Sequence, residues 1–343
     1  MIPKKALSVL LALAFLLGLS PLTFAGSAEK DPPKKRYTIL ALETTSATGF
    51  TSGGELIYTA SSSLPEVKEA ALRFLSDLEA SGDENHVSLL TYFGTTIQSD
   101  FTDRIDEVRE QIEPLWAKGS EIDLARVFYK SYDQFEKVDD PEAEKNLVIV
   151  TTGMANSGYT SPEGPFDATS PGSEWIYTPS KVSLWKYANG AIREAERLKN
   201  SGVKIYAIGM FQSMEGMPEK GQGVATLFRE TVKYLASDEF SYPVETPAQL
   251  NETFNEVAET INNDGVKPPE KPLQRGDVDF DGAITSADAR LALRRSVGLE
   301  AYEEGSKAFI ACDVDYDGKV SAADARLILR ASVGLEDPES WGK

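Results

Sequence analysis

The chain has 343 residues, and its 35 Lys and Arg against 54 Asp and Glu give a formal net charge of −19. This acidic balance argues against nucleic-acid binding, which normally requires a basic surface. The single cysteine, Cys312, excludes an intrachain disulfide and a multi-cysteine zinc site, and the single histidine, His86, leaves little for histidine-based metal catalysis. The length allows about two domains.

The first residues have the pattern of an export signal. Lys4 and Lys5 precede an apolar stretch over 6–19, and Thr23-Phe24-Ala25 is typical of a cleavage site, so residues 1–25 are predicted to be a signal peptide. The apolar stretch is shorter than the ~20 residues of a membrane-spanning helix. We therefore expect a secreted, extracellular protein that does not span a membrane, beginning with a polar spacer over 26–36.

Residues 37–262 alternate apolar runs of strand length with stretches of helical spacing. Strands are expected at 37–42, 86–93, 146–150 and 203–209, and helices at 64–80, 105–116, 124–135, 182–200 and 248–261. This alternation predicts an α/β domain with a doubly wound, mostly parallel sheet covered by helices on both faces.

A linker and an internal repeat follow. Residues 263–275 contain three prolines and no apolar periodicity, which indicates a linker. The segment 276–282 then recurs at 312–318, and 296–300 recurs at 332–336. Two copies of one unit predict a second, small, all-α domain over 276–338.

Each copy of the repeat carries the spacing of a calcium loop. Acidic residues occupy loop positions 1, 3, 5 and 12, a glycine occupies position 6, and position 7 offers a backbone carbonyl. Two Ca²⁺ sites are expected, because hard oxygen ligands favour calcium over transition metals. The expected ligands are Asp277, Asp279, Asp281, Ala283 and Asp288 in the first loop, and Asp313, Asp315, Asp317, Lys319 and Asp324 in the second.

These loops, each running into Ala-Asp-Ala-Arg-Leu at 287–291 and 323–327, closely resemble the type I dockerin module. The resemblance implies that calcium orders the domain and that one face then binds a cohesin on a scaffoldin or cell-surface protein. The alternative is that the repeat binds calcium for stability alone. The contacts that the resemblance implies are Ser286, Ala287, Arg294 and Arg295 in the first copy, and Ala322, Ala323 and Arg330 in the second. For the four apolar residues Leu293, Val297, Leu329 and Val333 we prefer core packing.

The large domain resembles a von Willebrand factor A (VWA) domain in its order of elements, from 42–47 at the end of the first strand to 150–156 and the closing 242–261. The resemblance implies a Rossmann-like sheet that binds Mg²⁺ at the carboxyl ends of its strands. The residues at the metal positions are Glu43, Thr45, Ala47, Ser120 and Thr152. Because Ala47 offers no oxygen and Thr152 replaces an acid, this degenerate edge is not expected to bind Mg²⁺, unless Asp123 compensates. The simpler interpretation is that Glu43 and Ser120 form hydrogen bonds within the turn.

Between 154 and 183 lies a long polar segment with four aromatic residues, Tyr159, Phe166, Trp175 and Tyr177. Long loops are often functional, so these rings could form a protein- or glycan-binding surface at the same edge. They could equally fold back onto the domain, and the sequence does not decide between the two.

The sequence favours a secreted, non-catalytic binding or adhesion protein, with a VWA-like domain that recognises an unknown protein or polysaccharide and a dockerin that docks it in a cellulosome-like assembly. The alternative is a carbohydrate-active enzyme, a glycoside hydrolase acting in polysaccharide catabolism, on the same docking module. Such an enzyme needs two carboxylates across a sugar-binding cleft, which an acidic chain could supply. We expect no catalytic residue, because no G-x-S-x-G or H-E-x-x-H motif occurs.

Overall fold

The computed structural model describes residues 33–45, 63–92, 96–97, 99–117, 119, 121–177, 180–211, 219–244, 249–268, 273–280, 282–298 and 305–342. The expected signal peptide, most of the spacer, and the site residues Ala47, Ser120 and Asp281 lie outside these ranges. Within the ranges, no helix combines the length and the hydrophobicity that a membrane crossing requires.

The large domain is built on one mixed sheet with strand order β3-β2-β1-β4-β7-β8. β1, β2, β4, β7 and β8 run parallel, and β3 pairs antiparallel with β2 at the edge. The central strands are buried along most of their length, as expected for a parallel sheet covered on both faces. The strands are β1 (Lys35–Glu43), β2 (Glu84–Tyr92), β3 (Thr96–Ile97), β4 (Glu144–Thr151), β7 (Lys204–Met210) and β8 (Ser241–Val244).

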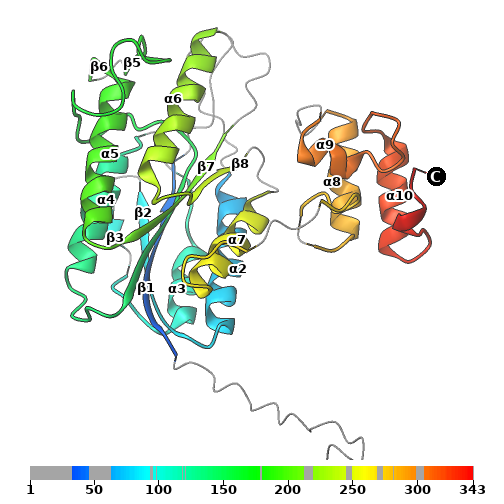
Figure 1. Cartoon of the computed structure of the whole chain (residues 1–343), viewed down its shortest axis with the longest axis horizontal. Coiled ribbons are helices and arrows are strands. Elements are labelled where there is room, and N and C mark those ends of the chain that lie inside the picture. The colour runs from blue at the N-terminus through cyan, green and yellow to red at the C-terminus, as the bar shows by residue number, and fades with distance from the viewer. Residues whose placement is uncertain are drawn as a thin grey trace, which may run out of the picture. The chain divides into compact units, whose positions relative to one another are not determined.

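Helices form a layer on each face of this sheet (Figure 1). One layer is α2 (Leu64–Ala80), α3 (Ile105–Ile112) and α7 (Leu250–Asn262), and the other is α4 (Leu124–Phe135), α5 (Leu184–Asn200) and α6 (Glu219–Leu235). Alternate residues of β1 enter the two cores, with Ile39 on the α4–α6 side and Leu40 on the α2–α7 side. The predicted doubly wound α/β domain is confirmed.

Three elements differ from the sequence-based expectation. The helix expected at 105–116 ends at Ile112, and the helix expected from 182 begins at Leu184, because 182–183 form the short strand β6 (Val182–Ser183) paired with β5 (Ile176–Tyr177). Helix α6 has no counterpart among the predicted elements. Its glycines Gly221 and Gly223 weaken the helical signal, although Val224, Leu227 and Phe228 pack into the core.

The amino ends of the strands carry a charged cluster around Arg36. The side chain of Arg36 is 1% exposed; its Nε lies 3.0 Å from Glu144 Oε2, its Nη2 lies 3.1 Å from Asp264 Oδ1, and its Nη1 binds Asp83. Lys34 also pairs with Asp264. The residues that enter and leave the large domain are therefore joined at the amino edge of the sheet.

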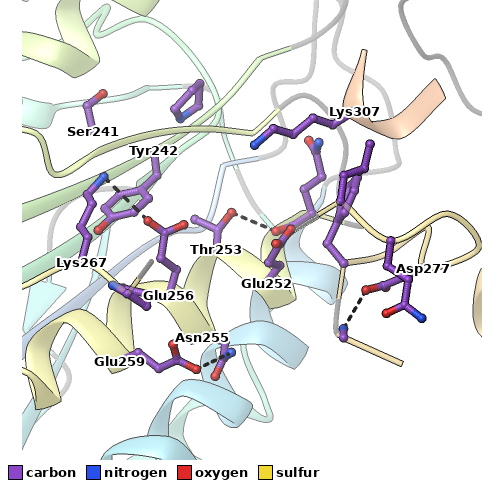
Figure 2. A pocket seen from close by; sticks show the side chains of 17 residues that line it. Ser241, Tyr242, Glu252, Thr253, Asn255, Glu256, Glu259, Lys267, Asp277 and Lys307 are labelled. Carbon is purple, nitrogen blue, oxygen red and sulfur yellow. Dashed lines mark hydrogen bonds and ion pairs between the residues drawn. The ribbon is translucent and has the colours of Figure 1, made fainter. Parts of the chain in front are cut away.

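The first linker residues pack on the large domain rather than beginning a free spacer. Lys267 Nζ lies 3.7 Å from Glu256 on α7 and 4.3 Å from the ring centroid of Tyr242 on β8, and Figure 2 shows these three side chains together. The linker was expected to begin at residue 263, but Lys267 still packs on the large domain.

The small domain is helical, as the sequence predicts, and its core is formed mostly by small residues. Its elements are α8 (Ser286–Ser296), α9 (Lys307–Cys312), α10 (Ala322–Ser332) and the 3₁₀ helix η2 (Pro338–Ser340). The core extends past the expected boundary at 338, because Trp341 is 8% exposed and belongs to it. Arg275, at the end of the expected linker, also contacts the small domain, since it donates a hydrogen bond to the carbonyl of Ile310 at 3.0 Å.

Candidate functional site

The acidic residues of the two repeats come together in two clusters. Carboxylate oxygens of Asp277, Asp279 and Asp288 lie within 4.8 Å of one another in the first loop, and those of Asp313, Asp315 and Asp317 do so in the second. Burial and the neighbouring carboxylates raise the pKa of Asp315, despite a hydrogen bond from the backbone of Asp317. This crowding of like charges is what a divalent cation would relieve.

The position-12 aspartates hold each loop to its helix. Asp288 is fully buried, and its carboxylate accepts hydrogen bonds from the amides of Val278 (2.6 Å) and Asp279 (3.1 Å) and from both the amide and hydroxyl of Thr285. Asp324 repeats this pattern with Val314, Asp315 and Ser321. Each therefore closes a capping box at the start of α8 or α10 as well as facing the loop.

The second loop has an oxygen suited to a cation. Asp313 Oδ1 is buried and has no hydrogen-bond partner among the described residues, which is costly unless a ligand satisfies it. The glycines at position 6, Gly282 and Gly318, have φ of +92° and +79°, so they permit the sharp loop turn. The position-7 residues Ala283 and Lys319 lie in the same turns. These features fit calcium, which would be held by Asp277, Asp279 and Asp288 in one loop and by Asp313, Asp315 and Asp317 in the other.

The four apolar residues for which we preferred core packing are exposed, and this preference is wrong. Leu293 on α8 and Val297, just after this helix, are 46% and 61% exposed. Their repeat partners, Leu329 on α10 and Val333 just after it, are 47% and 63% exposed. The core stripe is instead formed by Ala289, Ala292 and Ile328 together with other small residues, about one helical position away. Small side chains let α8 and α10 approach closely, which leaves the larger ones outside.

The expected cohesin contacts divide into surface and interior. Arg294 and Arg330 lie on the exposed faces of α8 and α10, and Ser286, Ala287, Ala322 and Ala323 lie at the first turns of these helices. Arg295 must be removed from this set, because it is 2% exposed and its Nη1 lies 3.4 Å from the carbonyl of Ala308 and 3.2 Å from Cys312 Sγ. Its equivalent in the second copy is Ala331.

At the carboxyl edge of the large domain, Glu43 is held entirely by threonines. Its carboxylate accepts hydrogen bonds from the hydroxyl of Thr45, the hydroxyl of Thr151 at 3.0 Å, and the amide and hydroxyl of Thr152, both at 2.7 Å. Four donors fill the accepting positions of one carboxylate. Burial raises the pKa of Glu43, and these hydrogen bonds oppose that shift.

Asp123 is engaged at the start of α4. It is the N-cap of α4, where its carboxylate accepts a hydrogen bond from the amide of Arg126 at 3.0 Å. The metal positions Ala47 and Ser120 lie outside the described residues. Among the described residues, the edge thus brings Glu43, Thr45 and Thr152 together in a hydrogen-bonded cluster.

Much of the aromatic segment folds back onto the domain. Phe166 is buried in the core beside α5, where Asn189 receives a hydrogen bond from its amide (3.2 Å) and donates one to its carbonyl (2.9 Å). Trp175 is partly buried against the same core. Tyr159 stays exposed, with the guanidinium of Arg193 6.0 Å from its ring centroid, and the side chain of Tyr177 lies outside the described residues.

The comparisons with known proteins address both domains. Residues 275–331 match the family model of the dockerin type I domain. The large domain is similar to the pilus adhesin SpaC from Lactobacillus rhamnosus GG, with 13% identity and a TM-score of 0.50 over 67% of this chain and 30% of that chain. The vWF domain of the type V pili tip protein Mfa5 from Porphyromonas gingivalis shows 16% identity and a TM-score of 0.48, over 70% of this chain and 99% of that one. No curated protein matches the chain.

Together with the sheet topology, the likeness to the pilus adhesin shows the fold of the large domain to be VWA-like. The chain therefore combines a VWA-like domain with a type I dockerin domain. Dockerins bind calcium and cohesins, and both acidic clusters lie in or beside the matched residues.

Proposed function

We propose that this chain is an extracellular, non-catalytic adhesion component, which a calcium-loaded dockerin attaches to a cohesin of a cellulosome-like assembly. The observation that carries the proposal is the repeated pair of acidic loops, each leading into a helix with an exposed leucine, valine and arginine. The resemblance to a dockerin and the family match point to the same partner.

Calcium dependence is tested by removing the first ligand of each loop. Asp277→Ala with Asp313→Ala is expected to abolish calcium-dependent ordering of the small domain and capture by immobilised cohesins, because ligand binding supplies folding free energy there. The matched control is Asp103→Ala with Asp139→Ala, two exposed acids of the large domain. Equal cohesin capture by the double loop variant and this control, with chelator making no difference, would contradict the proposal.

The docking face is proposed to be the exposed apolar surface of α8 and α10, flanked by Arg294 and Arg330. Exposed apolar side chains arranged together mark interaction surfaces. Because the two copies repeat the same surface, a partner could bind in either of two orientations. Leu293→Asp or Leu329→Asp alone should then leave capture by a cohesin largely intact, whereas the double substitution should abolish it. Val266→Asp, at a more exposed apolar position outside the dockerin, is the control.

For the VWA-like domain we propose recognition of a protein or polysaccharide at the carboxyl edge of the sheet. This edge carries the 154–183 segment, and it lies opposite the amino edge, where Lys34 and Arg36 bind Asp264. The carboxyl edge of an open α/β sheet is the usual place for a ligand. The proposal is tested by depletion of the mature protein on cellulose, xylan and pectin, with reducing-sugar detection in the same samples. Sustained release of reducing sugar would contradict the non-catalytic role.

We propose that the edge around Glu43 works without Mg²⁺. A cation there would have to displace hydrogen bonds that already satisfy the carboxylate, and the cost of exposing those buried donors opposes it. Magnesium titrated calorimetrically into the calcium-saturated protein should therefore give no further binding. A saturable magnesium site that Glu43→Ala removes would contradict this.

A further inference from the structure

The C-terminal residues beyond the family match close the small domain on itself. The 3₁₀ helix η2 is capped by Asp337, whose Oδ1 accepts the amide of Glu339 at 3.0 Å, and it delivers Trp341 to the core. The ring of Trp341 lies against Gly276 at the other end of the domain, where a Cβ would come within 2.6 Å of it. The first and last residues of the domain are thus in direct contact.

This closure involves the second calcium loop through Tyr316, which occupies loop position 4. The guanidinium carbon of Arg275 lies 3.8 Å from the ring centroid of Tyr316. Gly342 lies against the same ring, and a Cβ at residue 342 would approach it to 2.5 Å. Tyr316 has a φ of +64°, and Phe280 at position 4 of the first loop has a φ of +60°, so this uncommon backbone conformation is shared by both loops. Tyr316 is 54% exposed, and Arg275 and Gly342 cover part of its ring.

Arg275 also acts on the first ligand of that loop. It donates hydrogen bonds to the carbonyls of Asp313 and Ile310, and its Nη1 lies 3.6 Å from Asp313 Oδ2. The other carboxylate oxygen, Oδ1, is the buried atom that has no hydrogen-bond partner among the described residues. Arg275 therefore fixes the backbone of Asp313 and one of its oxygens, and it leaves the other oxygen for the loop interior.

The repeat does not provide the same clamp for the first loop. One repeat after Arg275 stands Ala311, which has no guanidinium, and one repeat before Trp341 stands Gly305. The residue that corresponds to Gly276 is Cys312, whose sulfur contacts Arg295. The two loops, nearly identical in their ligands, therefore differ in the residues that support them.

We propose that Arg275, Trp341 and Gly342 act through Tyr316 as positioning residues for the second calcium loop, so that this loop binds calcium more tightly and releases it more slowly than the first. The inference rests on the proposed calcium binding of both loops. Residues that orient metal ligands typically change metal affinity by about 10- to 100-fold when they are replaced.

The test measures each loop separately in the full mature chain. In an Asp277→Ala background, calcium is titrated calorimetrically into the chelated protein, so that only the second loop binds. Tyr316→Asn, which removes the ring while tolerating a positive φ, should weaken this site about tenfold or more. Phe280→Asn, the matched change at position 4 of the first loop, should leave it unchanged. Trp341→Ala should weaken it as Tyr316→Asn does.

A kinetic measurement guards against a background variant that fails to fold. Calcium release into excess chelator from the otherwise unaltered protein should show two phases. Tyr316→Asn should accelerate the slow phase, whereas Phe280→Asn should leave the slow phase unchanged. If Tyr316→Asn and Trp341→Ala leave both the affinity and the slow phase unchanged, the positioning role is overturned. If the unaltered protein binds no calcium, it is the proposed function that fails.

Discussion

At the scale of single residues, Glu43 shows how an acidic side chain can be held at a metal-type edge by threonines alone. Thr45 lies two residues after the end of β1, Thr151 ends the neighbouring β4, and Thr152 follows it. The sequence identifies the damaged metal pattern, but it does not reveal that Thr151, outside the expected set, donates to the same carboxylate. That contact depends on the parallel register of β1 and β4.

Replacing Glu43 should alter how stability depends on pH. Because the pKa of Glu43 is raised in the folded protein, its favourable contribution is present below about pH 4, and is lost as the pH rises through the folded pKa. Glu43→Gln keeps the shape without the charge, so its stability relative to the unaltered protein should increase between about pH 4 and pH 7. Urea unfolding at several pH values measures this, and parallel profiles would contradict it.

Glu43→Ala is the harsher change at the same position. It removes the acceptor of four buried hydrogen bonds, and leaving such donors unsatisfied costs about 1–3 kcal/mol. We expect it to lower the unfolding free energy of the large domain by about that amount at neutral pH, more than Glu43→Gln does. The same urea unfolding experiment compares the two variants, and equal stability would contradict the role of the carboxylate as acceptor.

At the scale of elements, most of the sheet and its helices could be predicted because apolar periodicity reports burial directly. The strand containing 146–150 and the helix at 64–80 are examples. Helix α6 is not predicted, because its glycines lower the helix propensity of the sequence, and the helix is stabilised by packing of its apolar face in the core. The helix faces of the small domain were misassigned for a related reason: Ala289 and Ala292 form the core stripe there, and periodicity arguments weight leucine and valine more heavily.

Besides backbone hydrogen bonds such as that from the amide of Ser161 to the carbonyl of Lys186, one buried side chain of α5 attaches the segment over 156–175 to this helix. Asn189 is buried and bonds both backbone groups of Phe166. Asn189→Ala should lower the unfolding free energy of the large domain by about 1–3 kcal/mol. Hydrogen exchange at the amide of Phe166 should become faster, because the free energy of opening there falls by about the same amount. Asn200→Ala, an exposed position at the end of the same helix, is the control. Unchanged exchange in Asn189→Ala would contradict this attachment.

At the scale of the whole molecule, the Arg36 cluster joins the two ends of the large domain. Hydrogen bonds from Lys34 and Arg36 hold the pKa of Asp264 below its usual range, and for Asp83 they outweigh the opposite effect of burial. A carboxyl group whose pKa is lowered in the folded protein stabilises the fold at pH values above its unfolded pKa of about 4. This contribution is lost as the pH falls through the lower, folded pKa. Acidification should therefore loosen the ends of the domain first.

Arg36→Met should test the cluster directly. We expect a loss of about 2 kcal/mol at neutral pH, less than for a fully buried pair because its three partners are partly exposed. Acidification from pH 5 to about pH 3 should also destabilise the variant less than the unaltered protein, because without Arg36 the pKa values of its partner carboxylates are lowered less in the folded state. Arg73→Met, which removes an exposed pair with Glu69, should cost at most about 0.5 kcal/mol.

The joined ends also determine how the domain meets mechanical load. A pull applied through the linker first meets the contacts of Lys267 with Glu256 and Tyr242. Once these are broken it arrives at Asp264, which is bound to Lys34 and Arg36 as well as to the end of α7. The force is thus divided between the last helix and the central strand β1 before it can peel α7 from the sheet. A ligand held at the opposite edge would pull roughly along the strands, so the hydrogen bonds between strands would resist it in shear.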